Sequence, residues 1–189
     1  MITDKKELAE AVCRDTETNL GKKKITSQAK FRASYPVRVC GYLKLLRRLE
    51  FAIWRRDHAK NAFAAKLAAQ KVKMIDRRRN LLGTKLGLEI PPCRVEKGVR
   101  IAHPGVILNG YVGEGCIFHG NNVLGNKRTG AGEEIPRLGK NVDVGVGAIV
   151  IGGVEIAEGC IIGAGAVVTR SFTTPGTVIA GVPAKEIKA

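Results

Sequence analysis

An aliphatic residue recurs at every sixth position in the C-terminal half of the chain, and this period constrains the fold more than any other feature. The unbroken run is Leu138, Val144, Val150, Ile156, Ile162 and Val168. Small residues follow most of these positions, and the fifth position of each hexad is small or apolar. An inward side chain on each short strand, followed by a corner, predicts triangular coils of three strands that stack into a solenoid.

The same six-residue step continues upstream, with a slip of one residue between Ile107 and Val112. The other upstream positions on this step are Val95, Ile101, Phe118 and Leu124. The hexads are interrupted at residues 126–137, which read NKRTGAGEEIPR. Insertions in solenoids form loops on one face and often the binding face, so we predict an extruded loop here.

Residues 1–86 carry a helical period instead. Thr3 is a plausible N-cap for a helix that reaches about Glu17, and residues 22–36 read as a polar connection. Apolar residues at three- and four-residue steps predict a helix over residues 37–56 and another from Ala59, with stop signals at Asn80 and Gly83. We therefore predict an α+β chain with two parts, a helical region (1–86) and a solenoid (87–189).

The positive charge belongs to the helical region. Residues 1–86 contain 22 Lys/Arg and 8 Asp/Glu, a net charge of +14, whereas residues 87–189 have a net charge of +1. A basic field attracts polyanions such as nucleic acid, an anionic membrane or a phosphorylated ligand, and a solvated helical surface explains it equally well. Aromatic residues are not interleaved with the charges, which argues against a specific nucleic-acid partner.

The five cysteines form no CxxC pair and no zinc-site spacing. Cys116 and Cys160 fall at fifth hexad positions, and we interpret them as small core residues rather than reactive thiols. No apolar run reaches the length of a membrane span, and the N-terminus has no apolar stretch of signal-peptide length. We therefore expect a cytoplasmic protein with reduced thiols, with association to an anionic membrane as an additional hypothesis.

The repeat resembles the hexapeptide-repeat acyltransferases, and three segments resemble the serine acetyltransferases among them. They read RIAHPGVIL (100–108), VGVGAIVIGGVEIAEGCIIGAGAVVTRS (144–171) and IAGVPAKEI (179–187). The stretch YLKLLRRLEF (42–51) resembles, more loosely, serine acetyltransferase-like proteins of capsule and exopolysaccharide biosynthesis. This resemblance implies a left-handed parallel β-helix, a homotrimer, and acetyl-CoA bound in the groove between neighbouring subunits.

The resemblance also implies a catalytic histidine. O-acetyl transfer needs a base that takes the proton of the attacking hydroxyl, and histidine titrates near neutrality. His103 lies where the motif places this base, and Glu89 is the nearest equivalent of the carboxylate that orients it. His119 is the alternative base, or a groove or packing residue, whereas His58 reads as a surface residue. A structural role at a coil corner remains the alternative for His103.

The remaining site residues also follow from the resemblance. The candidates for binding acetyl-CoA are Gly145, Ala148, Gly163 and Ala166 for the pantetheine arm, and Arg170 and Lys185 for the phosphates. The candidates for binding the acceptor are His119, Asn109 and Glu134. Small residues suit coil corners in any case, and the two cations could equally be solvated. We expect no metal, because the histidines do not supply a zinc ligand set.

The acceptor is predicted from departures from the family pattern. Serine acetyltransferases have an Arg-His pair before the loop proline and an Asp before the catalytic histidine, whereas this chain has Glu134, Ile135 and Ala102. A zwitterionic acceptor needs a cation and an anion, so these replacements favour a sugar or polysaccharide-precursor hydroxyl. Serine O-acetylation is the alternative, and a basic trimeric binding module without catalysis is the alternative from another class.

Overall fold

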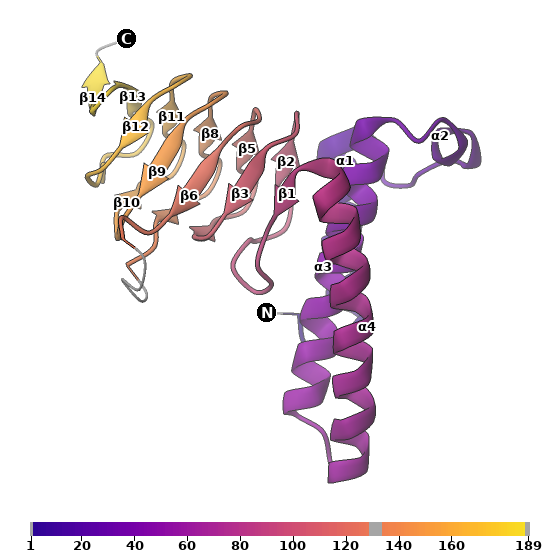
Figure 1. Ribbon diagram of the computed structural model, residues 1–189. Helices are drawn as coiled ribbons and strands as arrows, with labels where there is room; N and C mark the ends of the chain where they lie inside the picture. Colours follow the sequence, from indigo (N-terminus) through magenta and orange to yellow (C-terminus); the bar gives the residue numbers. More distant parts are fainter. Residues whose placement is uncertain (1, 129–133, 188–189) are drawn as a thin grey trace. The chain divides into compact units, whose positions relative to one another are not determined.

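The structure is a computed structural model that describes residues 2–128 and 134–187 (Figure 1). It divides the chain into two compact units, Met1–Leu86 and Gly87–Ala189, and each is described by itself. The first unit is helical and the second is built from short parallel strands. The α+β fold class predicted from the sequence is confirmed, with a helical region followed by a left-handed β-helix.

The helical unit has four helices. They are α1 (Lys5–Leu20), α2 (Ser27–Arg32), α3 (Tyr35–Asp57) and α4 (Ala62–Leu86). Both α1 and α4 pack against α3. A buried cluster of Leu49, Ala52 and Ile75, with Leu45, Ile53 and Val72 around it, joins α3 to α4. No helix in the described part of the chain combines the length and the apolar character needed to cross a membrane.

The helices differ from the sequence prediction: α1 ends at Leu20 and not at Glu17, and α4 begins at Ala62 and not at Ala59. Asp4 rather than Thr3 caps α1, because its carboxylate accepts hydrogen bonds from the backbone N–H groups of Lys6 and Glu7. The predicted polar connection contains the short helix α2. Helix α4 continues through Asn80 and Gly83 to Leu86, since packing overrides weak local stop signals.

A buried ionic cluster joins α1 to α3. The Arg47 guanidinium lies 2.8 Å from the Asp15 carboxylate and 3.2 Å from that of Glu50, and all three side chains are at most 4% exposed. Burial alone would lower the pKa of Arg47, but the two carboxylates raise it. The guanidinium therefore remains charged and compensates two buried anions.

Arg47→Met should destabilise the helical unit by about 3–5 kcal/mol, because two buried carboxylates lose their cation. Trp54 is the chain's single tryptophan and lies on α3, so its fluorescence during denaturant unfolding reports on this unit. Arg48→Met is the matched control: Arg48 is exposed, and its loss should change the free energy of unfolding by less than about 0.5 kcal/mol. Equal effects of the two substitutions would contradict the proposed role of the cluster.

The second unit has three sheets, named A, B and C here. Sheet A contains β1 (Leu88–Glu89), β3 (Val106–Leu108), β6 (Val123–Gly125), β9 (Ile149–Ile151) and β12 (Val167–Val168). Sheet B contains β4 (Tyr111–Val112), β7 (Arg137–Leu138) and β10 (Glu155–Ile156). Sheet C contains β2 (Arg100–Ile101), β5 (Ile117–Phe118), β8 (Asp143–Val144), β11 (Ile161–Ile162), β13 (Val178–Gly181) and β14 (Ala184–Ile187). All pairings are parallel except β13 with β14.

The predicted hexad residues form the core of this unit. The buried columns, in register along each sheet, are Leu108, Leu124, Val150 and Val168 in sheet A, Val112, Leu138 and Ile156 in sheet B, and Ile101, Phe118, Val144, Ile162 and Ile179 in sheet C. The prediction fails at Ile107, which faces outward and is 40% exposed. Strand β3 alternates Val106 and Leu108 inward with Ile107 outward, so Leu108 takes the core position.

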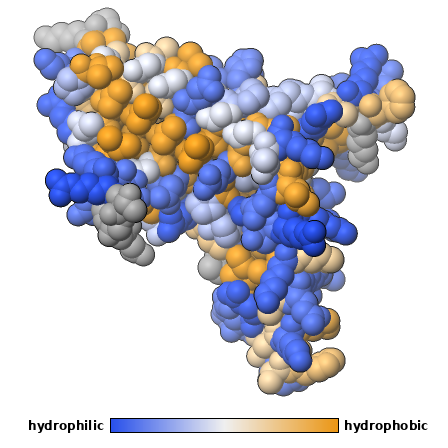
Figure 2. All heavy atoms as spheres, viewed as in Figure 1, coloured by the Kyte–Doolittle hydropathy of each residue, from blue (hydrophilic) through white to orange (hydrophobic). Residues whose placement is uncertain are grey.

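The outer face of sheet A is apolar from β3 to β12. Ile107, Val123, Ile149 and Val167 lie in register on neighbouring strands and point outward. Figure 2 shows hydrophobic residues gathered over the strands of this unit. An aliphatic column on the outside of a β-helix is not part of the buried core of its own chain. It is therefore a surface that another molecule can cover.

The predicted loop leaves the β-helix between sheets A and B. Val123 and Ile149 are neighbours in sheet A although 26 positions separate them, whereas Ile149 and Val167 are 18 positions apart. The coil that contains residues 126–137 is therefore eight residues longer than the next coil. Residues 129–133 of this loop lie outside the described part of the chain.

The five cysteines are free thiols, and Cys116 and Cys160 are fully buried core residues as predicted. Burial raises the pKa of both the Cys40 and the Cys116 thiols to about 11. A thiol must ionise before it reacts as a nucleophile, so these two thiols are protected both by their pKa and by burial.

Alkylation of the native protein with iodoacetamide at pH 8 should modify only the half-buried Cys13 and Cys93, as measured by peptide mass spectrometry. Cys40, Cys116 and Cys160 should react only in denaturant, where all five thiols become accessible. Modification of Cys116 in the native protein as fast as that of Cys13 would show that the core assignment is wrong.

Candidate functional site

His103 lies at a corner of the β-helix. Strand β2 in sheet C ends at Ile101, and strand β3 in sheet A begins at Val106, so residues 102–105 make the turn between the two sheets. The equivalent turns of later coils are residues 119–122, 145–148 and 163–166. We call this stack of turns the C/A edge. The side chain of His103 is exposed there.

Gly120 allows the next coil to pass close to His103. A Cβ atom on Gly120 would lie 2.7 Å from the Cβ of His103 and 3.1 Å from the carbonyl oxygen of Pro104. The backbone of Gly120 also has a φ of +116°, which residues with a Cβ rarely adopt. The position of the His103 side chain is therefore fixed in part by the absence of a side chain one coil away.

Asn122 holds this turn together and was not identified from the sequence. Its side chain is fully buried; its oxygen accepts a hydrogen bond from the N–H of Gly120, and its amide nitrogen donates to the carbonyl of Gly145 at 2.7 Å. One amide thus links two successive turns of the C/A edge. A polar residue between apolar hexad positions in GNNV is the only sequence signal that could have revealed it.

The structure pairs a carboxylate with His119. The Nε2 atom of His119 lies 2.8 Å from Oδ1 of Asp143, with the two side chains 45% and 40% exposed. His119 is aligned with Ala102, directly beside His103 on the C/A edge, because β5 follows β2 in register. Asp143 was not predicted, since 24 positions separate it from His119 and the irregular loop lies between them.

Glu89 lies farther along its coil than the predicted pairing requires. It is on β1, in register with Ile107 of sheet A, which is four positions beyond His103. Its side chain is exposed, and no hydrogen bond between Glu89 and His103 is found among the described residues. The orienting role of Glu89 therefore stays a prediction.

The four predicted small cofactor-binding residues all lie on the C/A edge but differ in exposure. Gly145 and Gly163 are partly exposed, in register above His119 on the outer side of sheet C. Ala148 and Ala166 are fully buried, and their N–H groups bond to the carbonyls of Gly145 and Gly163. This burial gives the two alanines a structural role in the turns and leaves them no exposed atom with which to contact a cofactor.

Arg170 and Lys185 lie away from this edge. Arg170 is exposed after β12, where sheet A turns into sheet B, and its guanidinium packs 5.1 Å from the centre of the Phe172 ring. Lys185 is exposed on β14, in register with Ala180 of β13. Their predicted contacts with CoA phosphates stay predictions.

The predicted acceptor residues Asn109 and Glu134 lie on a different edge from His103, the turn between sheets A and B. The Asn109 side chain bonds to Arg94 at 2.6 Å and to Asn126 at 2.8 Å. Glu134 is exposed, whereas Ile135 is 3% exposed and packs inward. One chain therefore does not bring the described part of the loop to His103.

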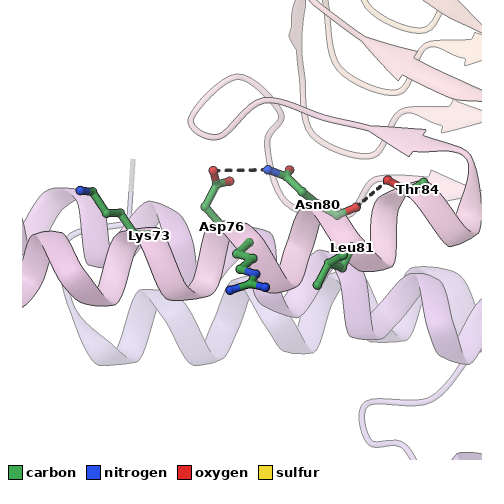
Figure 3. A pocket seen from close by; sticks show the side chains of 6 residues that line it. Lys73, Asp76, Asn80, Leu81 and Thr84 are labelled. Carbon is green, nitrogen blue, oxygen red and sulfur yellow. Dashed lines mark hydrogen bonds between the residues drawn. The ribbon is translucent and has the colours of Figure 1, made fainter.

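A surface hollow lies on helix α4, and Figure 3 shows the side chains that line it. They are Lys73, Asp76, Arg77, Asn80, Leu81 and Thr84. Asn80 bonds to Asp76, and the Thr84 hydroxyl donates to the Asn80 carbonyl. The lining contains no histidine or cysteine, so it lacks a group suited to proton transfer at neutral pH. Within residues 2–128 and 134–187 no group of three His, Cys, Asp or Glu could hold a metal ion.

The chain is similar to serine acetyltransferases in sequence and in fold. It is 36% identical over 126 residues to the serine acetyltransferase of Synechococcus elongatus, a match that covers 64% of this chain and 51% of that protein. The soybean serine acetyltransferase apoenzyme superposes with a TM-score of 0.72 at 23% identity, covering 95% of this chain and 69% of that one. A serine acetyltransferase in complex with CoA superposes with a TM-score of 0.68 at 15% identity, covering 97% and 70%. No protein-family profile matches the chain.

These similarities confirm the resemblance to the serine acetyltransferases and the β-helix fold. The curated relatives are serine acetyltransferases, which corresponds to the alternative of the sequence analysis and not to the sugar acetylation that it preferred. The chain spans about half the length of the Synechococcus relative, and the solved structures, at under 25% identity, bear on the fold alone. The resemblance to capsule and exopolysaccharide proteins stays a prediction.

Gly120→Ala should disturb His103 without unfolding the coil. The strained backbone and the close contact with the His103 Cβ should lower the free energy of unfolding by about 1–3 kcal/mol. The ring resonances of His103 should shift in a proton NMR spectrum, where only three histidines contribute.

Gly125→Ala is the matched control, because no atom lies within 4 Å of the position of its Cβ. It should leave the His103 resonances unchanged. An identical spectrum for Gly120→Ala and the wild type would show that the close approach does not position His103.

Proposed function

We propose that this homologue of the serine acetyltransferases, built on the hexapeptide-repeat β-helix, transfers the acetyl group of acetyl-CoA to the hydroxyl of L-serine. The observation that carries the proposal is the 36% identity to a serine acetyltransferase over 126 residues, together with an exposed histidine on the C/A edge. The reaction class was predicted from the sequence as an O-acetyltransferase, and serine replaces the sugar as the preferred acceptor.

His103 serves as the general base in this proposal. Its imidazole takes the hydroxyl proton of serine while the serine oxygen attacks the thioester carbonyl carbon. The tetrahedral intermediate then collapses, the carbon–sulfur bond breaks, and the imidazolium returns the proton to the departing thiolate. A group that accepts and then donates one proton near neutral pH is required, and histidine meets this requirement without a metal.

The C/A edge supports binding of the extended pantetheine arm. Above His119 the column continues with Gly145, Gly163 and Ala180, so the outer side of sheet C is lined by small residues next to His103. A surface of small side chains suits a narrow chain with amide groups. We assign the acetyl-CoA groove to this surface, with Gly145 and Gly163 as contacts.

The proposal includes assembly as a homotrimer. The outer column Ile107, Val123, Ile149 and Val167 is an apolar surface that a second copy would remove from water. The described part of the loop and His103 lie on different edges of one chain, so a site that uses both requires a neighbouring copy. Two features of this chain thus support the shared active site implied by the family resemblance.

His103→Ala should reduce kcat with L-serine by about two to four orders of magnitude, because the reaction loses a positioned base. The release of free thiol from acetyl-CoA measures turnover. His58→Ala is the matched control: His58 is exposed on the helical unit, its Nδ1 lies 3.0 Å from the Trp54 carbonyl, and its loss should leave kcat unchanged.

A panel of acceptors tests the remainder of the proposal. Turnover with L-serine and not with neutral sugars supports serine as the acceptor. Turnover with a sugar alone would overturn it and return the acceptor to the sequence-based prediction. If the wild type does not bind acetyl-CoA, the proposed acetyltransferase activity is overturned and a binding module without catalysis is favoured.

A further inference from the structure

Three ionisable side chains gather on the outer face of sheet C, next to His103, and none has a role in the proton transfer described above. Arg100 begins β2, Asp143 begins β8, and His119 follows β5. Arg100 is exposed, and His119 and Asp143 are both close to half-exposed. These side chains are therefore open to a ligand, whereas their strand neighbours Ile101, Phe118 and Val144 point into the core.

The strand register places these groups in two adjacent columns. Arg100, Ile117 and Asp143 form one column, and Ala102, His119 and Gly145 form the other. Neighbouring strands lie about 4.8 Å apart, so the backbones of Arg100 and Asp143 are about 10 Å apart, with Ile117 between them. Arg100 and Asp143 therefore present a cation and an anion on the same face of sheet C, on either side of Ile117.

Asp143 can accept a further hydrogen bond. The carboxylate of Asp143 receives the His119 Nε2 contact at 2.8 Å on Oδ1. A carboxylate has about four acceptor positions, so its second oxygen can still accept from a ligand. The contact with His119 fixes the direction of the carboxylate, and the small side chain of Ala102 leaves the surface beneath His119 open.

We infer that Arg100, Asp143 and His119 bind the charged end of an α-amino acid acceptor. Asp143 accepts hydrogen bonds from the α-ammonium, Arg100 donates to the α-carboxylate, and His119 holds Asp143 in position. The inference rests on the proposed function and deepens it, since it names the residues that select a zwitterionic hydroxy acid over a neutral sugar. Arg100 and Asp143 are specificity residues, and His119 is a positioning residue.

The charge pattern fits this ligand better than a sugar. A zwitterion needs one anion and one cation at opposite ends, and charge-assisted hydrogen bonds to carboxylates are among the strongest in proteins. A neutral hydroxyl ligand would gain little from an exposed Arg100 and an exposed Asp143 on the same face of sheet C. Arg100 and Asp143 thus provide a cation and an anion on the β-helix itself. The loop provides no such cation at Glu134, which is an exposed acid two positions before Pro136.

The test crosses two variants with acceptor analogues that lack one charge each. Asp143→Asn should lower kcat/KM for L-serine by about 10- to 100-fold, the value of a hydrogen bond to a charged group, mainly through KM. With 3-hydroxypropionate, which has no ammonium, wild type and Asp143→Asn should differ by less than about threefold. Arg100→Gln should show the converse pattern, with a loss for L-serine that disappears for ethanolamine, which has no carboxylate.

Glu155→Gln is the matched control, because Glu155 is an exposed acid on β10 of sheet B. It should leave all three acceptors unaffected. Equal losses of Asp143→Asn with L-serine and with 3-hydroxypropionate would overturn the inference, because the carboxylate would then act on the fold or on catalysis rather than on the ammonium.

Calorimetric binding of L-serine in the presence of CoA separates this inference from the proposed function. Binding that weakens about 10- to 100-fold in Asp143→Asn supports the recognition site even if the wild type releases no thiol. If the wild type releases thiol and both variants keep its kcat/KM for L-serine, the recognition site is overturned and the acetyltransferase activity is not. Absence of both serine binding and serine turnover overturns both.

Discussion

The β-helix depends on the stacking of inward aliphatic side chains from coil to coil. Each strand is only two to four residues long, so no strand can bury its apolar residue alone. Columns such as Leu108, Leu124 and Val150 are fully buried because the coil above and the coil below cover them. Parallel pairing in register keeps these residues aligned, and the same register determines which outward side chains become neighbours on the surface.

The turns convert this stacking into a candidate active site. Gly120 lets one coil approach His103, and Asn122 ties the turn of Gly120 to the turn of Gly145 through buried hydrogen bonds. The histidine is therefore held by backbone geometry on one side and remains open to solvent on the other. This combination of a fixed position and an exposed ring suits the role of general base that is proposed for His103.

The sequence predicted the repeat well because a six-residue period is imposed by the geometry of each coil. The prediction failed at Ile107, where strand β3 carries two inward residues, and at the helix ends, where packing outweighs local signals. For the site, the residues predicted from the sequence as His103, His119, Gly145 and Gly163 lie together on the C/A edge, and their roles stay predictions. It placed Ala148 and Ala166 at the cofactor, although both are fully buried in the turns.

The sequence by itself determined the two-part organisation, the inward columns and the histidine-bearing edge, because periodicity and local motifs depend on residues close together in the chain. Only the tertiary structure decided that Asp143 contacts His119 and that the described part of the loop lies on a different edge from His103. These relations depend on how many residues each coil contains. The coil with the loop is eight residues longer than the next, so residues 24 positions apart become diagonal neighbours, which no local pattern records.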